Sequence, residues 1–205
     1  QNNVQGASDV GALPNVYSDY RPVTDPEARA EHAEAWGVEP PDNVGLRIPD
    51  MFDASHAGTL KAMYILAEDV AQSDPNTDHV VGALEKLDFL VAQEIFMNPT
   101  AELADVVLPG TTFLEKAGTF VNSDRRIQRV RAAMKPLEGT RIDAEITHEI
   151  ARRMGVDLGF ADEAGHVDPA KVMEELSGLS PKWRGVTYER LEEEGFLQWP
   201  CVDAD

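Results

Sequence analysis

Apolar positions along the chain follow two spacings. Compact apolar runs typical of buried strands occur at LKAMYIL (60–66), DFLVAQ (88–93) and ADVVLP (104–109). Between the first two runs, HVVGALEKL (79–87) repeats its apolar side chains at the spacing of one helical face, and a short helix is predicted near TAELA. Strands that alternate with helices in this way are typical of a parallel sheet. We therefore predict an α/β fold, with a Rossmann-like parallel sheet and flanking helices.

Other patterns lie on both sides of these strands. Residues 1–24 are predicted to be loop, and PEARAEHAEAW is predicted to be a helix, capped by Asp25 and closed by Gly37. GTFVN and RIQRVR surround a polar connection and predict a β-rich segment. Helices are predicted at 143–155, 169–179 and YERLEEEG, before an aromatic tail. We divide the chain into a sheet part (1–112), a β-rich segment (113–142) and a C-terminal helical segment (143–205).

The charge narrows the range of partners. The formal net charge is −19, from 37 acidic and 18 basic residues. So acidic a chain is not expected to bind nucleic acid or an anionic membrane surface. No apolar run approaches the roughly 20 residues of a membrane span, so membrane insertion is not expected. The single cysteine, Cys201, excludes a disulfide or a cysteine-bound metal cluster within this chain and favours a reducing, cytoplasmic compartment.

Polar side chains follow the predicted parallel strands. Ligands of open parallel sheets bind beyond the carboxyl ends of the strands. Asp69 and Ser73 follow the first strand, and Gln93 ends the second. A carboxylate such as Asp69 can accept two hydrogen bonds from a ribose diol or from the N1–H and amine of guanine. Alternatively, Asp69 and Ser73 shape turns and cap the next helix.

Two further observations limit the chemistry. No GxGxxG or GxxxxGK[ST] sequence follows a strand, and the five histidines form no cluster with metal-ligand spacing, so we expect no metal ligands here. DRRIQRVR concentrates Arg125, Arg126, Arg129 and Arg131 in an acidic protein. These arginines either pair with surrounding carboxylates or form a cradle for a phosphate or an anionic cofactor.

Several sequence blocks occur together in one known family. They are QNNVQGASDVGALP, DPEARAEHAEAWGV, LKAMYILAEDVAQSDP, LVAQEIFMNPTAELADVVLP, EKAGTFVNSDRRIQRV and GVTYERLEEEGFLQWPC. In this order they resemble the catalytic alpha subunit of molybdenum- or tungsten-dependent formate dehydrogenases, within the molybdopterin oxidoreductases. AELADVVLP and GTFVNSDRRIQ mark the wider class, and the first and last blocks point to formate dehydrogenase.

The resemblance implies an oxidoreductase that oxidises formate to carbon dioxide at a bis-molybdopterin guanine dinucleotide centre containing Mo or W. It also implies that this chain is an internal fragment. The [4Fe–4S] cluster, the metal-ligating cysteine or selenocysteine, and the catalytic histidine and arginine of the family lie upstream of Gln1, so the fragment alone is predicted to be inactive. Implied partners are the rest of the catalytic subunit and electron-transfer subunits that carry iron–sulfur clusters or bind NAD.

The resemblance also assigns cofactor-binding residues, with no catalytic residue among them. Gln1 matches a glutamine beside the pterin, and Asp69, Ser73 and Gln93 match positions near a guanosine end of the cofactor. Asp143 matches an aspartate that binds guanine. By this reading, residues 1–112 are part of the cofactor-binding domain and residues 143–205 complete the cofactor-binding region.

One position departs from the family pattern, because Ala67 stands where a glycine is common. Alanine is expected to avoid a positive φ, so the sequence predicts a slightly different turn there.

Two alternatives to a formate dehydrogenase remain. One is another molybdopterin oxidoreductase, such as a nitrate reductase. The other is a non-catalytic relative that uses this domain as a scaffold, as in respiratory complex I. The five matching binding residues favour an enzyme, because a scaffold needs no guanosine contact.

Overall fold

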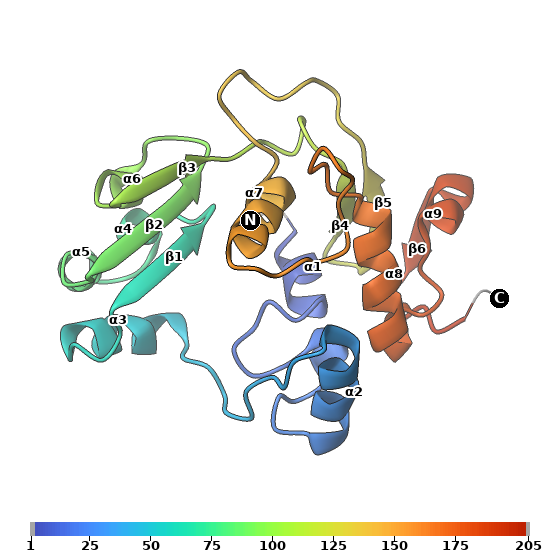
Figure 1. Cartoon of the computed structure of the whole chain (residues 1–205), viewed down its shortest axis with the longest axis horizontal. Coiled ribbons are helices and arrows are strands. Elements are labelled where there is room, and N and C mark those ends of the chain that lie inside the picture. Colours follow the sequence, from blue (N-terminus) through green and yellow to red (C-terminus); the bar gives the residue numbers. More distant parts are fainter. Residues whose placement is uncertain (1–2, 204–205) are drawn as a thin grey trace. The chain divides into compact units, whose positions relative to one another are not determined.

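The computed structural model describes residues 3–203, and contacts divide the chain into two compact units (Figure 1). The parallel unit comprises Leu46–Lys116 and Ala132–Leu158, and the antiparallel unit comprises the remaining described residues. The chain thus enters each unit more than once, whereas the three segments expected from the sequence are consecutive stretches. The binding roles assigned to those segments stay predictions.

The sheet of the parallel unit contains β1 (Ala62–Leu66), β2 (Phe89–Glu94) and β3 (Val106–Pro109). The strands run parallel in the order β1-β2-β3 (Figure 1). Leu66 lies opposite Gln93, and Gln93 lies opposite Leu108. Five helices belong to this unit: α3 (Ile48–His56), α4 (Val70–Ser73), α5 (Thr77–Leu84), α6 (Pro99–Glu102) and α7 (Asp143–Arg153). The predicted α/β fold with a parallel sheet and flanking helices is confirmed.

The core of the parallel unit lies on one face of its sheet. Ile65 of β1 and Leu90 of β2 pack in one buried cluster with Phe52 of α3 and Leu84 of α5. Burying each such side chain contributes roughly 1.5–3 kcal/mol. Tyr64, the neighbour of Ile65, remains exposed, because successive side chains of a strand point to opposite faces. This alternation brings the Tyr64 side chain to the polar residues described below.

The turn after β1 corrects one expectation. Ala67 adopts a φ of 53°, so the prediction that alanine avoids a positive φ here is wrong. The Ala67 amide donates to the Gln93 carbonyl oxygen at 2.9 Å, which extends the strand ladder by one bond. Helix α4 then begins at Val70. These two constraints hold a conformation that costs a non-glycine residue about 1–2 kcal/mol.

The antiparallel unit contains a second, separate sheet. It comprises β4 (Gly118–Val121), β5 (Arg126–Val130) and β6 (Phe196–Gln198), with β5 in the centre. Its helices are α1 (Val4–Asp9), α2 (Pro26–Trp36), α8 (Pro169–Leu179) and α9 (Tyr188–Glu194), with short 3₁₀ turns at Ser18–Tyr20 and Pro181–Trp183. The two predicted β segments are confirmed as β4 and β5, and the aromatic tail contributes the third strand.

Local signals account for the ends of helix α2. Asp25 accepts a hydrogen bond from the Glu27 amide at 3.0 Å, Pro26 occupies the first turn, and Gly37 closes the helix with a φ of 67°. The predicted cap and stop are therefore both confirmed. In the core of this unit, Trp183, Ile127 and Leu191 are almost fully buried against one another.

The prediction that residues 1–24 form a loop is wrong for part of that stretch, because Val4–Asp9 forms α1. Its stability comes from tertiary bonds that a local pattern does not encode. Asp9 is fully buried, and its Oδ1 accepts from Gln5 Nε2 at 2.8 Å and from the Tyr20 hydroxyl at 2.7 Å. Among residues 3–203, no helix has the length and apolar character needed to cross a membrane.

Candidate functional site

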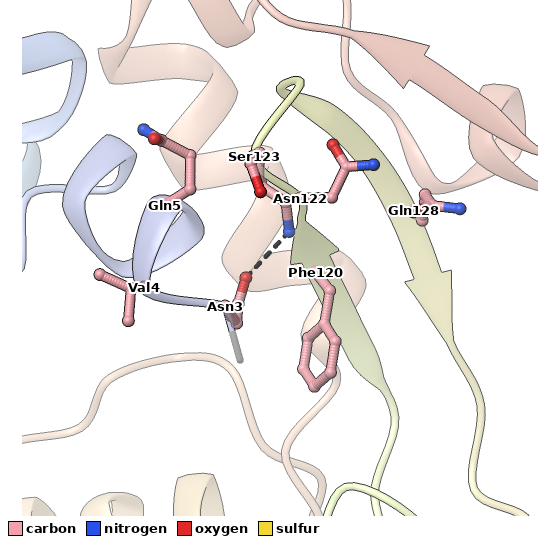
Figure 2. A pocket seen from close by; sticks show the side chains of 8 residues that line it. Asn3, Val4, Gln5, Phe120, Asn122, Ser123 and Gln128 are labelled. Carbon is pink, nitrogen blue, oxygen red and sulfur yellow. Dashed lines mark hydrogen bonds between the residues drawn. The ribbon is translucent and has the colours of Figure 1, made fainter. Parts of the chain in front are cut away.

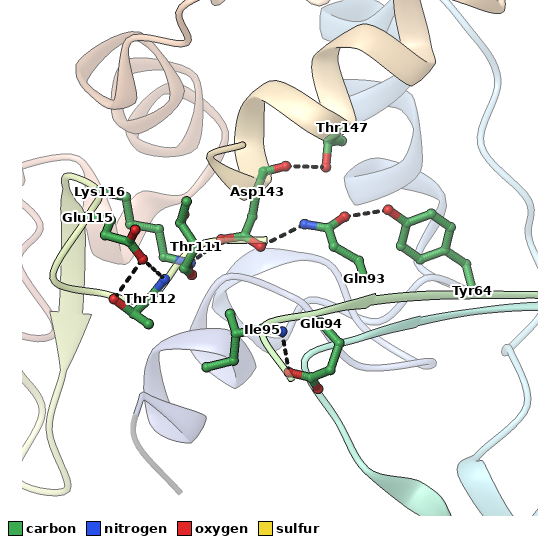
Figure 3. Close-up of polar contacts among 10 residues, drawn as sticks. All are labelled: Tyr64, Gln93, Glu94, Ile95, Thr111, Thr112, Glu115, Lys116, Asp143 and Thr147. Atoms are coloured by element: carbon green, nitrogen blue, oxygen red, sulfur yellow. Dashed lines mark hydrogen bonds and ion pairs between the residues drawn. The ribbon is translucent and has the colours of Figure 1, made fainter. Parts of the chain in front are cut away.

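A chain of polar contacts lies at the carboxyl end of the parallel sheet (Figure 3). Gln93, near the end of β2, is 1% exposed. Its side-chain oxygen accepts from the Tyr64 hydroxyl of β1, and its Nε2 donates to Asp143 Oδ1 at 2.7 Å. The structure therefore brings together two of the residues selected from the sequence, Gln93 and Asp143. The buried Gln93 amide fixes the orientation of the Asp143 carboxylate.

Asp143 forms an ion pair with Lys116. Asp143 is the first residue of α7, where the helix dipole stabilises a negative charge. Its Oδ2 accepts from Lys116 Nζ, which also donates to the Thr111 carbonyl oxygen at 2.9 Å (Figure 3). The side chains of Lys116 and Asp143 are 30% and 21% exposed. A ligand can therefore reach a charged pair whose geometry is set by buried neighbours.

Gly110 provides space for this pair. A Cβ atom at position 110 would lie 2.6 Å from Asp143 Oδ1 and 3.7 Å from Gln93 Cγ. Any other residue at this position would push the carboxylate away from Gln93. Glycine is required here for space and not for an unusual backbone conformation. The Gly110 backbone simply continues the sheet, because its amide donates to the Glu94 carbonyl oxygen at 3.1 Å.

The segment before Lys116 is held by a buried carboxylate. Glu115 accepts hydrogen bonds from the Thr112 amide at 2.8 Å, the Thr112 hydroxyl at 3.0 Å and the Leu137 amide at 2.8 Å. These bonds, above all that from the Thr112 amide, hold the pKa of Glu115 below its usual value. Glu115 thus stays ionised and anchors the backbone that carries the Lys116 ammonium group.

Tyr64 completes the chain of contacts as a hydrogen-bond donor. Although the Tyr64 ring is exposed, partial desolvation of its hydroxyl group, and secondarily the negative charge of Asp143, raise the pKa of Tyr64 above its ordinary value. Tyr64 is therefore protonated near neutral pH and donates to Gln93. This bond fixes the Gln93 side-chain oxygen toward Tyr64. The amide nitrogen of Gln93 therefore points toward Asp143 and donates to it.

Asp69 and Ser73 lie in contacts of their own. Asp69 Oδ1 accepts from the Thr100 amide at 3.2 Å and the Thr100 hydroxyl at 2.7 Å, and the same hydroxyl accepts from the Ala71 amide at 3.0 Å. The exposed Ser73 hydroxyl donates to Glu68 at 3.0 Å. The Thr100 bonds join α6 to the start of α4, and both sets of contacts match the turn-shaping alternative for Asp69 and Ser73. Their contact with a cofactor stays a prediction.

The antiparallel unit has a surface pocket of its own, of about 460 Å³ (Figure 2). Four amide side chains contribute to its lining, which comprises Asn3, Val4, Gln5, Phe120, Val121, Asn122, Ser123 and Gln128. Asn3 Oδ1 accepts from the Val121 amide at 2.9 Å and joins α1 to β4. Gln1, predicted to approach a pterin, lies outside the described residues, so its predicted role remains open.

The arginines of DRRIQRVR are engaged within the antiparallel unit. Three guanidinium groups lie over aromatic rings: Arg125 over Trp199 at 4.1 Å, Arg126 over Phe196 at 4.6 Å and Arg129 over Tyr188 at 3.9 Å. Each also lies beside a carboxylate, those of Asp9, Asp124 and Glu192 respectively, and Arg131 shares Glu192. These contacts favour the ion-pair interpretation of the arginine run.

Sequence reasoning missed Tyr64, Gly110 and Lys116. Lys116 had one available signal, because lysine is scarce in this chain and this one stands in the EKAGTF block. Tyr64 and Gly110 had none, since only the fold brings Tyr64 to Gln93 and Gly110 to Asp143. Among residues 3–203, no group of three or more histidine, cysteine, aspartate or glutamate side chains is arranged to hold a metal ion.

The chain is similar to several known proteins. A family profile described as molybdopterin oxidoreductase matches residues 1–153. "Probable oxidoreductase YjgC" of Bacillus subtilis is 47% identical over 204 residues, which are 100% of this chain and 20% of that protein. "Formate dehydrogenase H" of Escherichia coli is 42% identical, with 99% of this chain and 28% of that protein covered.

Two further proteins are similar. "F420-dependent formate dehydrogenase subunit alpha" of Methanocaldococcus jannaschii is 43% identical, over 99% of this chain and 29% of its own length. Among solved structures, acetylene hydratase from Pelobacter acetylenicus matches with a TM-score of 0.59 at 22% identity, over 84% of this chain and 24% of that one. The solved structure supports the fold alone, and the chain spans 20–29% of the length of these curated relatives.

Proposed function

Because the chain belongs to the molybdopterin oxidoreductase family, we propose that it is the cofactor-binding part of a formate dehydrogenase catalytic subunit. The observation that carries this proposal is the Gln93–Asp143–Lys116 contact chain at the carboxyl edge of a parallel sheet. Relatives named formate dehydrogenase, 42–43% identical over nearly the whole chain, support the choice of enzyme.

The residues at this edge fit the guanine end of a molybdopterin guanine dinucleotide. An ionised carboxylate has about four lone-pair positions. Gln93 and Lys116 each occupy one position on Asp143, so one remains on each oxygen. Guanine presents N1–H and a 2-amino group side by side, which match the two open positions. Within this proposal Gln93 acts by orienting Asp143, because Gln93 itself is buried.

Asp69 and Ser73 belong to the same proposal in a secondary role. Asp69 Oδ1 is used by Thr100, while the carboxylate is only partly buried. Its other oxygen is the one that we assign to a ribose hydroxyl, with the exposed Ser73 hydroxyl beside the same sugar. For the pterin end, we propose a contact with Gln1, as the family resemblance implies.

A titration of the purified 205-residue chain with GDP tests the guanine contact. We expect isothermal titration calorimetry to detect binding, and Asp143→Ala to weaken it by about 10-fold or more, since two hydrogen bonds to a charged group are lost. Asp88→Ala is the matched control, because Asp88 is also paired with a lysine, Lys61 at 3.8 Å, but at the opposite end of β2. The control should bind GDP as the wild type does.

Two results would count against the proposal. A wild-type chain that binds no GDP would remove the guanine site altogether. Equal binding by wild type and Asp143→Ala would remove Asp143 from it. Circular dichroism and thermal melting of each variant exclude unfolding as the cause of a lost signal.

For the complete subunit, we propose oxidation of formate to carbon dioxide at a bis-molybdopterin guanine dinucleotide centre with Mo or W, with a [4Fe–4S] cluster and electron-transfer partner subunits, in the cytoplasm. When bound, the cofactor supplies the redox chemistry at its metal, and the residues described here hold and orient it. Formate-dependent dye reduction by the complete, cofactor-loaded subunit is the test. Nitrate reduction without formate oxidation would favour a nitrate reductase-like enzyme, and a loaded subunit without either activity would favour a scaffold relative.

A further inference from the structure

Lys116 retains one hydrogen-bond donor beside Asp143. A lysine ammonium group has three N–H donors. Among residues 3–203, the partners of Lys116 Nζ are the Thr111 carbonyl oxygen and Asp143 Oδ2 (Figure 3). The Lys116 side chain is 30% exposed. Its third N–H donor is therefore available to a molecule that also contacts Asp143. The donor and the open carboxylate positions therefore form one composite recognition surface.

The position of this donor is fixed by its surroundings. The Thr111 carbonyl holds the ammonium group from one side and Asp143 from the other. The three hydrogen bonds of Glu115 fix the backbone immediately before Lys116. Gln93 in turn fixes Asp143. A recognition group held in this way loses little conformational entropy when a ligand binds.

The two charged groups match three adjacent positions on one purine. Guanine carries the O6 acceptor beside the N1–H donor and the 2-amino donor, whereas adenine carries an amino group in place of O6. We propose that Lys116 is a specificity-determining residue that donates to guanine O6, while Asp143 accepts from N1–H and the 2-amino group. This inference rests on the proposed guanine contact of Asp143 and deepens it by assigning recognition of the purine 6-position to Lys116, while Asp143 recognises the N1–H and 2-amino groups that adenine also lacks. An adenine amino group would direct its N–H groups at the ammonium and be rejected.

The test compares GDP with 6-thio-GDP and ADP on the complete 205-residue chain by isothermal titration calorimetry. 6-thio-GDP keeps N1–H and the 2-amino group and replaces only O6 by sulfur, a weaker acceptor. We expect the wild type to prefer GDP over 6-thio-GDP by about 10-fold and over ADP by about 100-fold, the range expected for a hydrogen bond from a charged donor. Lys116→Met should weaken GDP binding by about 10-fold and bind GDP and 6-thio-GDP equally.

Lys61→Met is the matched control, because Lys61 pairs with Asp88 in the same unit, and it should keep the full preference. Lys116→Met also frees Asp143 Oδ2, which changes overall affinity but not the ratio between the two guanine ligands. The ratio is therefore the diagnostic quantity.

The outcomes separate the two proposals. A wild type that binds GDP and 6-thio-GDP equally overturns the role of Lys116, and this measurement needs no variant to fold. A folded Lys116→Met that keeps the wild-type preference overturns it as well, while the guanine contact of Asp143 stands. A wild type that binds none of the nucleotides overturns the guanine site itself and this inference with it.

Discussion

In the antiparallel unit, three guanidinium groups on or beside β5 lie over aromatic rings, whereas in the parallel unit the ammonium group of Lys116 donates hydrogen bonds to two oxygen atoms. The arginines use their planar faces for stacking and their edges for carboxylates, a combination that lysine lacks. Lys116 instead contacts an accessible carboxylate whose remaining lone pairs are open. The first arrangement joins strands and helices of a core, and the second presents unused donors and acceptors.

The comparison teaches that local abundance of positive charge was a poor guide to a binding site. The arginine run stands out in the sequence, yet its charges are matched within the unit by Asp9, Asp124 and Glu192. Lys116 is one of several lysines in the parallel unit and is inconspicuous in the sequence, yet it stands beside the aspartate that the family resemblance connects with guanine. Four substitutions measure how much individual contacts stabilise each unit, two of them at Arg129 and the Arg125 partner Asp9 in the antiparallel unit and two in the parallel unit.

The largest effect is expected for Asp9→Ala. This fully buried carboxylate accepts from Gln5 and Tyr20 and lies 3.6 Å from Arg125. Its removal leaves these donors without an acceptor and should lower the free energy of unfolding by about 3 kcal/mol. Urea denaturation measures this loss. Glu163→Ala, an exposed acid of the same unit, is the control, and unchanged stability of Asp9→Ala would refute the structural role.

The next effect is expected for Arg129→Met. Arg129 is 12% exposed, lies 3.9 Å from the Tyr188 ring centroid and donates to Gly118 and Glu192. Loss of the stack and these bonds should cost about 1–2 kcal/mol of stability in thermal or urea unfolding. Arg131→Met is the matched control, since Arg131 shares Glu192 but is 59% exposed, and it should cost less than about 0.5 kcal/mol. Similar losses for both variants would argue against a special contribution of the buried stack.

A smaller effect, of opposite sign, is expected at the turn after β1. Ala67→Gly removes the strain of a left-handed alanine, which costs the folded state about 1–2 kcal/mol. The glycine also adds backbone entropy to the unfolded chain, which destabilises the fold by about 0.5–1 kcal/mol. The net expectation is a gain of about 0.5–1 kcal/mol in urea denaturation. Ala57→Gly, at an ordinary φ of −74°, should give no gain. A loss of stability in Ala67→Gly would show that the Ala67 turn is not strained.

The smallest effect concerns the end of α7 opposite to Asp143. Hydrogen bonds from Arg152 and then Arg153 lower the pKa of Glu149 to about 2. Because this folded-state pKa lies below the ordinary value of 4.5, the ionised carboxylate stabilises the fold above about pH 4.5, and its contribution disappears as the pH falls toward 2. Wild type should therefore melt slightly above Glu149→Gln at pH 7.

The sign can be checked by following both proteins by thermal melting from pH 7 to pH 2, where the two melting temperatures should converge. Glu85→Gln, which replaces an exposed acid of the same unit, is the control. The difference between its melting temperature and that of the wild type should not shrink as the pH falls. A difference between wild type and Glu149→Gln that grows on acidification would contradict the assignment.

Elements defined by local signals could be predicted from the sequence. Helix α8 spans Pro169–Leu179 as predicted, because Asp168 caps its first turn and accepts from the Ala170 amide at 2.9 Å. Strand β2 is displaced by only one residue from its predicted range. Such signals lie within a few residues of the element that they define.

Elements held by distant partners could not be predicted. Strand β6 has three residues and exists because it pairs with β5, far earlier in the chain. Helix α1 depends on the bond between Asp9 and Tyr20, and the left-handed Ala67 depends on the Gln93 carbonyl. In each case the deciding contact is absent from the local pattern.

The amino-acid sequence was sufficient to predict the three parallel strands, the cap of helix α2 and the family resemblance that points to Gln93 and Asp143. Only the tertiary structure decided that these two residues meet and that Lys116 and Gly110 stand beside them. Gln93 and Asp143 are 50 positions apart, and Lys116 and Asp143 are 27 apart. Contacts at such separations depend on how the chain folds back on itself, whereas a sequence pattern reports only the few neighbours within a turn or a strand.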